Sequence, residues 1–233
     1  GLAPFKLAKT SSVRTRSVPP VPLEEALALE VGPDPVVGRV AEGYDVFGIP
    51  HGGYLAALAA KAVLARAGLP DLFSVTTHFL RKAAVGPIRF EVEAAGQSRR
   101  FRALRASGRQ DGQVVLALSA LVGDRETIDG PSWEGSAGWD HRSAPLTPPA
   151  GAPDAGLPTP AVAERLGLRL DLDTLGFTRG EAAREARVRG TVRATPVDQL
   201  LALIACDITP PAVWNVLGPS GWVPTVELTA HIR

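Results

Sequence analysis

The sequence predicts an α+β fold, in which a buried helix packs against an antiparallel sheet. Residues 54–67 read YLAALAAKAVLARA, contain neither Gly nor Pro, and are followed by Gly68 and Pro70, a pattern typical of a helix and its end. Only Lys61 and Arg66 are charged, so the helix is apolar on nearly every face and we expect it to be buried. Strand-like segments come next, and the same order of elements recurs later in the chain.

The strand-like segments differ from the helix in their periodicity. In IRFEVEA, Ile88, Phe90 and Val92 alternate with polar residues, which places the three apolar side chains on one face of a strand. Asp111-Gly112 predicts a hairpin turn between the last two strands. The predicted strands of this first unit are residues 74–80, 88–94, 100–105 and 114–122.

A second unit echoes the first. The alternation REARVRGTVR predicts a strand over residues 184–193, QLLALIACDI predicts a helix with Asp198 as its N-cap, and residues 223–233 predict a final strand. The strands VTTHF and LTAHI carry a His at the same position, which indicates an internal repeat. We therefore expect four regions: an N-terminal arm and lead-in (1–35), a first unit (36–124), a Pro/Gly-rich linker (125–183) and a second unit (184–233).

The second unit is shorter than the first. Three predicted strands follow the strand that contains His78, whereas the sequence stops two residues after His231. A sheet that stopped there would keep an unpaired edge. By analogy with the first unit, we expect roughly 40 further residues to complete the second.

Composition excludes several classes of function. The formal net charge is +1 and no basic run exceeds two residues, so nucleic acid is not expected as a partner. The lone Cys206 can form neither an intramolecular disulfide nor a cysteine metal cluster. No apolar stretch approaches the ~20 residues that span a bilayer. We expect a cytoplasmic protein that does not insert into membranes, and the exposed sheet edges favour a homodimer.

The first candidate site is His51-Gly52-Gly53-Tyr54, directly before the buried helix. Paired glycines let a ligand approach the backbone closely, and the free N–H groups of a helix start can polarise a carbonyl. The alternative is a turn that needs flexible glycines. Both interpretations stay open on the tetrapeptide alone.

The second candidate is Asp207, which has only apolar neighbours near the predicted end of its helix. Burying a carboxylate is costly unless it is partnered, so such a group is a candidate general base. Asp207 could equally cap the exposed helix end. Thr225 could position a water through its hydroxyl, although Thr is also a common strand residue. His78 lies in a predicted strand, where it is either a structural residue or a residue that contacts the edge of a bound ligand.

Two pairs of segments resemble a known family. HGGYLAALAAKA with VTTHFLRKAAVGP is similar to the first half of acyl-CoA thioesterases of the thioesterase II class, and ACDITPPAVW with GWVPTVELTAHIR to the second half. The resemblance implies a double hotdog, in which two long central helices are each wrapped by an antiparallel β-sheet. It also implies that the substrate is an acyl-CoA, that the protein has a role in fatty acid metabolism, and that no metal or other cofactor is needed.

In that family an Asp, a Thr or Ser, and a Gln orient the hydrolytic water. By motif, the Asp corresponds to Asp207 and the hydroxyl to Thr225, while the Gln has no counterpart before Arg233. The resemblance leaves His51, Gly52, Gly53, Tyr54 and His78 as candidate substrate-binding residues. The first helix has Ala59, Ala60 and Lys61 where single-hotdog relatives place a carboxylate, which implies one active site per chain.

Two alternatives keep this fold. A non-catalytic acyl-CoA-binding protein would explain the missing Gln. A hotdog enoyl-CoA hydratase or dehydratase would use His51 as its catalytic histidine.

Overall fold

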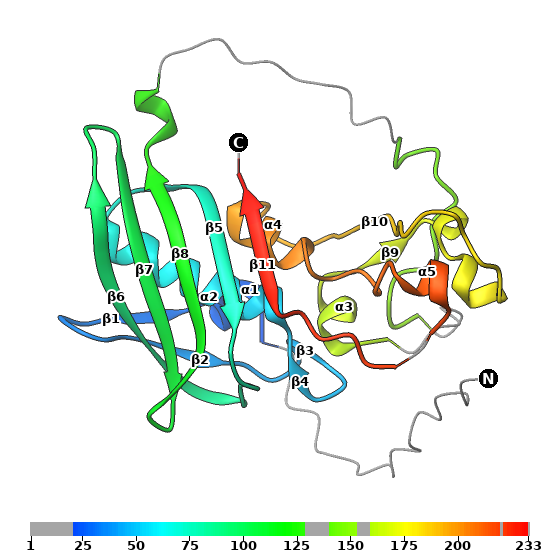
Figure 1. Ribbon diagram of the computed structural model, residues 1–233, viewed down its shortest axis with the longest axis horizontal. Helices are drawn as coiled ribbons and strands as arrows, with labels where there is room; N and C mark the ends of the chain where they lie inside the picture. Colours follow the sequence, from blue (N-terminus) through cyan, green and yellow to red (C-terminus); the bar gives the residue numbers. More distant parts are fainter. Residues whose placement is uncertain (1–20, 129–139, 153–158, 220, 233) are drawn as a thin grey trace.

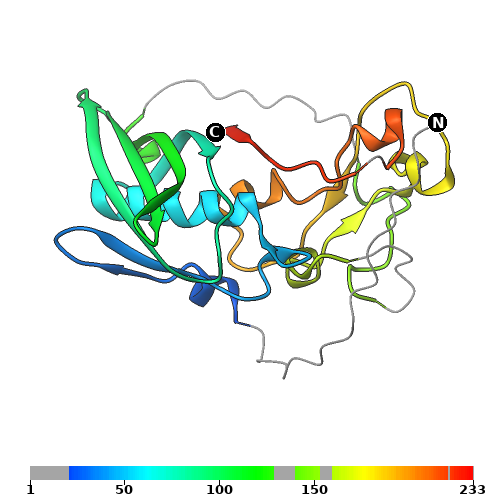
Figure 2. The same ribbon diagram turned by 60° about the horizontal axis from the view of Figure 1, so that its bottom comes forward.

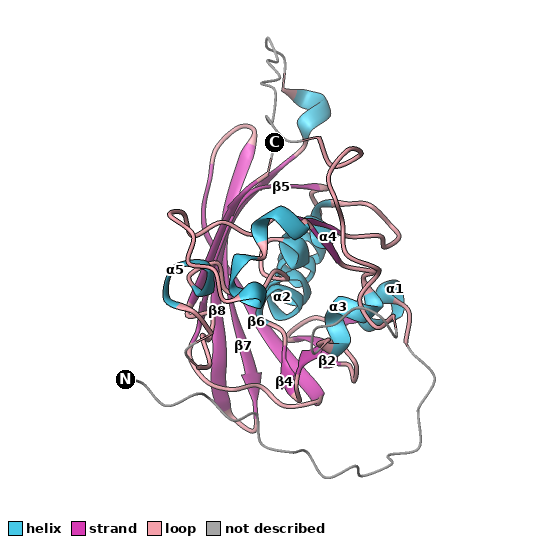
Figure 3. Cartoon of the chain, turned by 90° about the vertical axis from the view of Figure 1, so that its right-hand side faces the viewer, coloured by secondary structure: helices cyan, strands magenta, loops and turns pink. Residues whose placement is uncertain are grey.

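A curved antiparallel sheet wrapped around one long helix dominates the computed structural model, which describes residues 21–128, 140–152, 159–219 and 221–232 (Figure 1). Figure 3 looks nearly along α2 (Gly52–Ala67) and shows the sheet curving around it. The seven strands follow the order β1 (Leu29–Val31), β2 (Val36–Val40), β6 (Gly86–Gln97), β7 (Phe101–Gln110), β8 (Gln113–Gly123), β5 (Asp71–Phe79) and β11 (Glu227–His231). The predicted α+β class and the hot dog arrangement of helix and sheet are therefore observed.

The predicted buried helix is confirmed. Eleven residues of α2 are buried, including Tyr54, Leu58 and Val63. Gly68 ends the helix with a φ of 63°, a left-handed conformation that glycine adopts without steric cost. A mostly apolar, Ala-rich helix thus fills the curve of the sheet.

The predicted strands of the first unit are confirmed as β5 to β8, each longer than its prediction. Asp111 and Gly112 connect β7 to β8 with φ values of 47° and 74°, as in the two-residue hairpin turns that match strand twist. The side chains of Ile88 and Phe90, on the inner face of β6, are fully buried. Local periodicity was sufficient to define this half of the fold.

The second unit departs from its predictions. Its helix, α4 (Gln199–Ala205), has seven residues, so of the two long central helices predicted for a double hotdog, only α2 is long among the described residues. Asp207 follows α4 in a turn instead of lying in its last helical turn. Pro210 and Pro211 lie close behind, and neither can donate to a continuing helix.

The predicted strand over residues 184–193 is also wrong for most of its length. Only Gly190–Thr191 (β10) is extended in a ladder, opposite β9 (Arg169–Leu170). Asn215 explains the difference, because its side-chain amide donates to the Arg187 carbonyl at 2.6 Å and its own carbonyl accepts from Ala183 N–H at 2.6 Å. These backbone groups are therefore satisfied by the side chain and the main chain of one residue in α5.

The two units meet along β5 and β11. The strands are antiparallel, with Thr76 opposite Thr229, Val75 opposite Ala230 and Thr77 opposite Leu228. Because Thr76 and Thr229 occupy the same position in the two repeats, the pairing has the symmetry of a two-fold axis between them. Helix α2 also packs against α4. This arrangement supports the internal repeat.

Short elements make up the rest of the described chain. Figures 1 and 2 place α3, β9 and α5 on the far side of the molecule from β6 to β8. These remaining elements are α1 (Leu23–Ala26), β3 (Asp45–Val46), β4 (Ile49–Pro50), η1 (Arg125–Thr127), α3 (Ala161–Arg165), η2 (Leu172–Thr174), η3 (Gly176–Arg179) and α5 (Trp214–Leu217).

Candidate active site

The Asp207 carboxylate lies where the two units meet. Its Oδ2 accepts a hydrogen bond from Gly53 N–H in the first turn of α2, at 2.9 Å. Its Oδ1 accepts one from the Thr225 hydroxyl, at 2.6 Å. The side chain is 13% exposed, so it is mostly buried but not closed off from solvent. The structure thus brings together three predicted site residues from distant parts of the sequence.

His51 is the N-cap of α2 and is 3% exposed. Its Nδ1 accepts from Tyr54 N–H at 3.2 Å. Its Nε2 lies 3.0 Å from the main-chain oxygen of Asp207 and 3.4 Å from Oδ2 of the carboxylate. Both ring nitrogens therefore contact protein groups in and around the site.

The two glycines lie close to other parts of the chain, Gly53 against backbone and Gly52 against the ends of side chains. A Cβ on Gly53 would lie 2.9 Å from the Cα of Ile204 and 2.9 Å from the carbonyl oxygen of Leu203. A Cβ on Gly52 would lie 2.7 Å from Oδ2 of Asp207. Both glycines are helical and neither has a positive φ. The alternative of a flexible glycine turn is therefore wrong, and a steric requirement for glycine exists at Gly53.

The amides at the start of α2 are nearly all occupied. Gly53 N–H donates to Asp207, Tyr54 N–H to the His51 ring and Leu55 N–H to the His51 carbonyl. Gly52 N–H has no acceptor in the part of the chain that the structure describes. Since the first N–H groups of a helix project beyond its end, this amide is the donor available to a substrate oxygen.

Tyr54 contributes its backbone to the site, but its side chain points elsewhere. The hydroxyl donates to the Ala26 carbonyl at 2.7 Å and accepts from Ala41 N–H at 3.1 Å. Burial raises the pKa of Tyr54 to about 12, and its ring stacks on Tyr44 at 4.8 Å between centroids. The side chain fixes α2 against the lead-in segment.

His78 is not brought to this site. Thr77 on β5 is buried, whereas the next side chain, His78, is 55% exposed and lies 3.6 Å from the Glu227 carboxylate. Alternation along the strand puts the two on opposite faces. Phe79, which sequence reasoning did not single out, does reach the site: its Cζ lies 3.2 Å from the position of a Gly52 Cβ. It shares the inner face with Thr77, which is the signal that could have found it.

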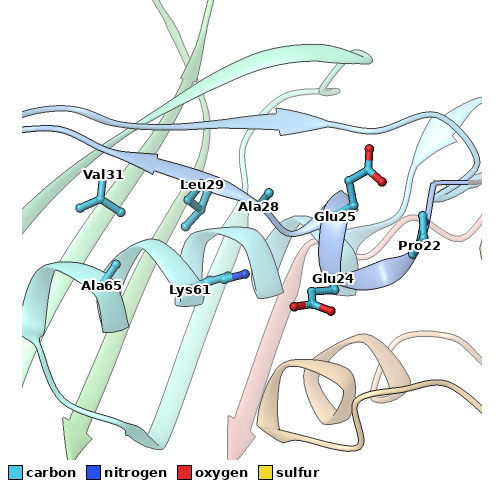
Figure 4. A pocket seen from close by; sticks show the side chains of 8 residues that line it. All are labelled: Pro22, Glu24, Glu25, Ala28, Leu29, Val31, Lys61 and Ala65. Atoms are coloured by element: carbon cyan, nitrogen blue, oxygen red, sulfur yellow. The ribbon is translucent and has the colours of Figure 1, made fainter.

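A separate groove runs along α2. Figure 4 shows Lys61 and Ala65 on one side, with Leu29 and Val31 of β1 across from them and Glu24 and Glu25 at one end. Lys61 is nine residues beyond Gly52, about 13 Å along the helix axis. The groove is therefore distinct from the Asp207 site.

The described residues contain neither a cluster of metal-binding side chains nor a membrane-spanning helix. Within them, no three His, Cys, Asp or Glu side chains gather as metal ligands. No described helix has both the length and the apolarity to cross a bilayer.

Together, the wrapped helix and a carboxylate facing its first turn define a hot dog fold protein with a candidate hydrolytic site. Residues 40–123 match the family model of the acyl-CoA thioesterase N-terminal domain, and residues 140–233 match that of the C-terminal domain. The chain belongs to the acyl-CoA thioesterase family. A comparison with curated proteins gave no match.

Solved structures share the fold at low identity. A candidate thioesterase II from Thermobifida fusca is 20% identical with a TM-score of 0.75, over 91% of this chain and 81% of that one. A hot dog fold protein of unknown function from Alicyclobacillus acidocaldarius is 24% identical, with a TM-score of 0.71 over 90% and 77%. A candidate thioesterase from Novosphingobium aromaticivorans is 22% identical, with a TM-score of 0.65 over 88% and 80%. These likenesses support the fold.

Proposed function

We propose that the protein hydrolyses acyl-CoA thioesters to a free acid and CoA by Asp-directed attack of water. The observation that carries this proposal is the Asp207 carboxylate, held between the first turn of α2 and the Thr225 hydroxyl. In a chain of the acyl-CoA thioesterase family, a carboxylate beside an unoccupied helix-start amide supports a site that binds a thioester oxygen next to a general base. A substrate and a water molecule would meet there.

In the proposed reaction, Asp207 accepts a proton from water as the water oxygen attacks the thioester carbonyl carbon. Thr225 holds the carboxylate in place and helps to position the water. The Gly52 amide stabilises the negative charge that develops on the carbonyl oxygen, while the Gly53 amide keeps its hydrogen bond to the carboxylate. The C–S bond then breaks, and the departing sulfur receives the proton from Asp207 to give CoA, which returns the carboxylate to its charged form. Tyr54 fixes the helix that supplies these amides.

The two alternatives are separated by different observations. For a hydratase or dehydratase, His51 would have to exchange protons with the substrate, yet both of its ring nitrogens contact protein groups. A non-catalytic acyl-CoA-binding protein could use the same amides. Release of CoA from an acyl-CoA thioester distinguishes an enzyme from such a binding protein.

The decisive variant is Asp207→Asn, which keeps the shape of the side chain and removes its basicity. We expect hydrolysis of a panel of saturated acyl-CoA thioesters to fall about 10²–10⁴-fold, the usual contribution of a general base. Thr225→Val should cost about 10–100-fold, since it removes a hydrogen bond to a charged group. Thiol release measures the rate, and circular dichroism checks the fold.

Near-normal turnover in Asp207→Asn would show that another group activates water. A wild-type protein that binds acyl-CoA in calorimetry without releasing CoA would instead be a binding protein. Enoyl-CoA thioesters in the same panel test hydration.

We further propose that the protein works in the cytoplasm, in fatty acid metabolism, as a homodimer that neither inserts into membranes nor binds nucleic acid. Among the described residues, β1 and β11 have a neighbouring strand on one side only, so either edge could pair with a second copy. Light scattering coupled to size exclusion would measure the assembly.

A further inference from the structure

The main chain of Asp207 needs an anchor of its own. Helix α4 ends at Ala205, and Asp207 lies in the following turn, where its N–H donates to the Ile204 carbonyl at 3.2 Å. Its carbonyl oxygen is outside the helical ladder. The partner of that oxygen is the His51 ring, at 3.0 Å. A residue 156 positions away thus holds the backbone of the candidate base.

The hydrogen bonds assign different roles to the two nitrogens of His51. Tyr54 N–H can only donate, so Nδ1, its acceptor, carries no proton. In the neutral ring the proton is then on Nε2. The main-chain oxygen of Asp207 at 3.0 Å is a closer acceptor for it than Oδ2 at 3.4 Å. The ring therefore donates to the backbone of Asp207.

Burial makes this contact hard to replace. His51 is 3% exposed, so water has little access to take over either hydrogen bond. The ring also belongs to the segment that supplies Gly52 and Gly53. One side chain consequently sets the position of the Asp207 backbone relative to the amides that its carboxylate faces.

We propose that His51 is a positioning residue, which holds the Asp207 main chain in register with the first turn of α2 and exchanges no proton with the substrate. This inference rests on the proposed function, because it assumes that Asp207 acts on the thioester. This role differs from the two that the sequence analysis predicts for His51, which are contact with the substrate and acid–base catalysis in a hydratase.

Two substitutions separate the functions of the ring. His51→Asn retains a short side-chain oxygen that can cap α2 through Tyr54 N–H, but its amide is too short to reach the Asp207 carbonyl. His51→Ala loses both contacts. His231→Asn, an exposed histidine at the end of β11, is the matched control.

We expect His51→Asn to lower kcat about 10-fold, the equivalent of one hydrogen bond, with KM changed less than about twofold and the shape of the pH–rate profile retained. His51→Ala should lose kcat and thermal stability together, and added imidazole should restore part of its kcat. His231→Asn should match the wild type. Imidazole should not restore Asp207→Asn.

Wild-type kcat in His51→Asn would overturn the proposal. So would a rise in KM at constant kcat, which indicates a direct substrate contact, or the loss of one limb of the pH–rate profile, which indicates proton transfer. Nitrogen-15 NMR of the wild-type ring tests the tautomer without any variant, and a proton on Nδ1 would also overturn the proposal. Full activity in Asp207→Asn would instead refute the proposed function, which separates the two failures.

Discussion

The starts of α2 and α4 are built differently, although the two helices occupy corresponding places in the repeat. At the start of α4, Asp198 caps its own helix, and its Oδ1 accepts from Leu200 N–H at 3.0 Å and Leu201 N–H at 2.9 Å. At the start of α2, the carboxylate that bonds Gly53 N–H is Asp207, from the other unit. One helix start is satisfied locally, and the other is completed across the boundary between units.

The difference shows how a repeat can produce an asymmetric site. The paired strands β5 and β11 and the packed helices α2 and α4 retain the symmetry of the repeat. The chemistry does not, because α2 carries Ala59 and Ala60 in its interior while the second unit supplies Asp207. In the proposed mechanism the first unit provides the helix-start amides and the second provides the carboxylate that acts as the base.

Gly53→Ala should have the largest effect on this boundary. The new Cβ would lie 2.9 Å from the backbone of Leu203 and Ile204, atoms that cannot move without shifting α4. We expect the free energy of unfolding to fall by about 1–3 kcal/mol, as for other overpacked cores, together with a loss of thioester hydrolysis. Urea unfolding measures the first quantity and thiol release the second.

The control is Gly96→Ala, where a Cβ would meet nothing within 4 Å. It should stay within about 0.5 kcal/mol of the wild type. Equal stability of the two variants would mean that the helices are not in close contact at Gly53.

The boundary also marks the limit of what sequence could predict. Helix α2 follows from an apolar run without Gly or Pro, and strands β5 to β8 follow from strand-like segments and the turn residues between them, because each of these signals lies within the element itself. The strand predicted over 184–193 failed because Asn215, 28 residues beyond Arg187, takes its carbonyl. Alternation cannot reveal such a distant hydrogen bond.

The candidate site divides in the same way. Asp207, Thr225 and the His51-Gly52-Gly53 segment were found from local sequence and from resemblance to a family. Their contacts were not, since Gly53 and Asp207 are 154 residues apart. The role of Gly53 in particular depends on the backbone of α4, which no spacing along the chain encodes.

Asp198→Ala should have a smaller effect than Gly53→Ala, because it removes a cap within one unit. Losing an N-cap carboxylate typically costs about 1 kcal/mol, and we expect a decrease of that size in the free energy of unfolding. Asp198→Ser keeps a capping oxygen and should recover most of it. Urea titration of the wild type, Asp198→Ala and Asp198→Ser measures these differences. If Asp198→Ala lowered kcat as much as Gly53→Ala, the two helix starts would not be independent.

Thr77→Val should have the smallest effect and the opposite sign. The Thr77 hydroxyl is fully buried on the inner face of β5 and has no hydrogen-bond partner among the described residues. Replacing it with a methyl group of similar size removes an unsatisfied polar group, so stability should be unchanged or rise by up to about 1 kcal/mol. Thr76→Val, on the outer face, breaks the 3.0 Å contact with Thr229 across the boundary and should lower stability slightly. Parallel thermal unfolding compares the two, and a clear loss in Thr77→Val would reveal an acceptor for its hydroxyl at the boundary between the units.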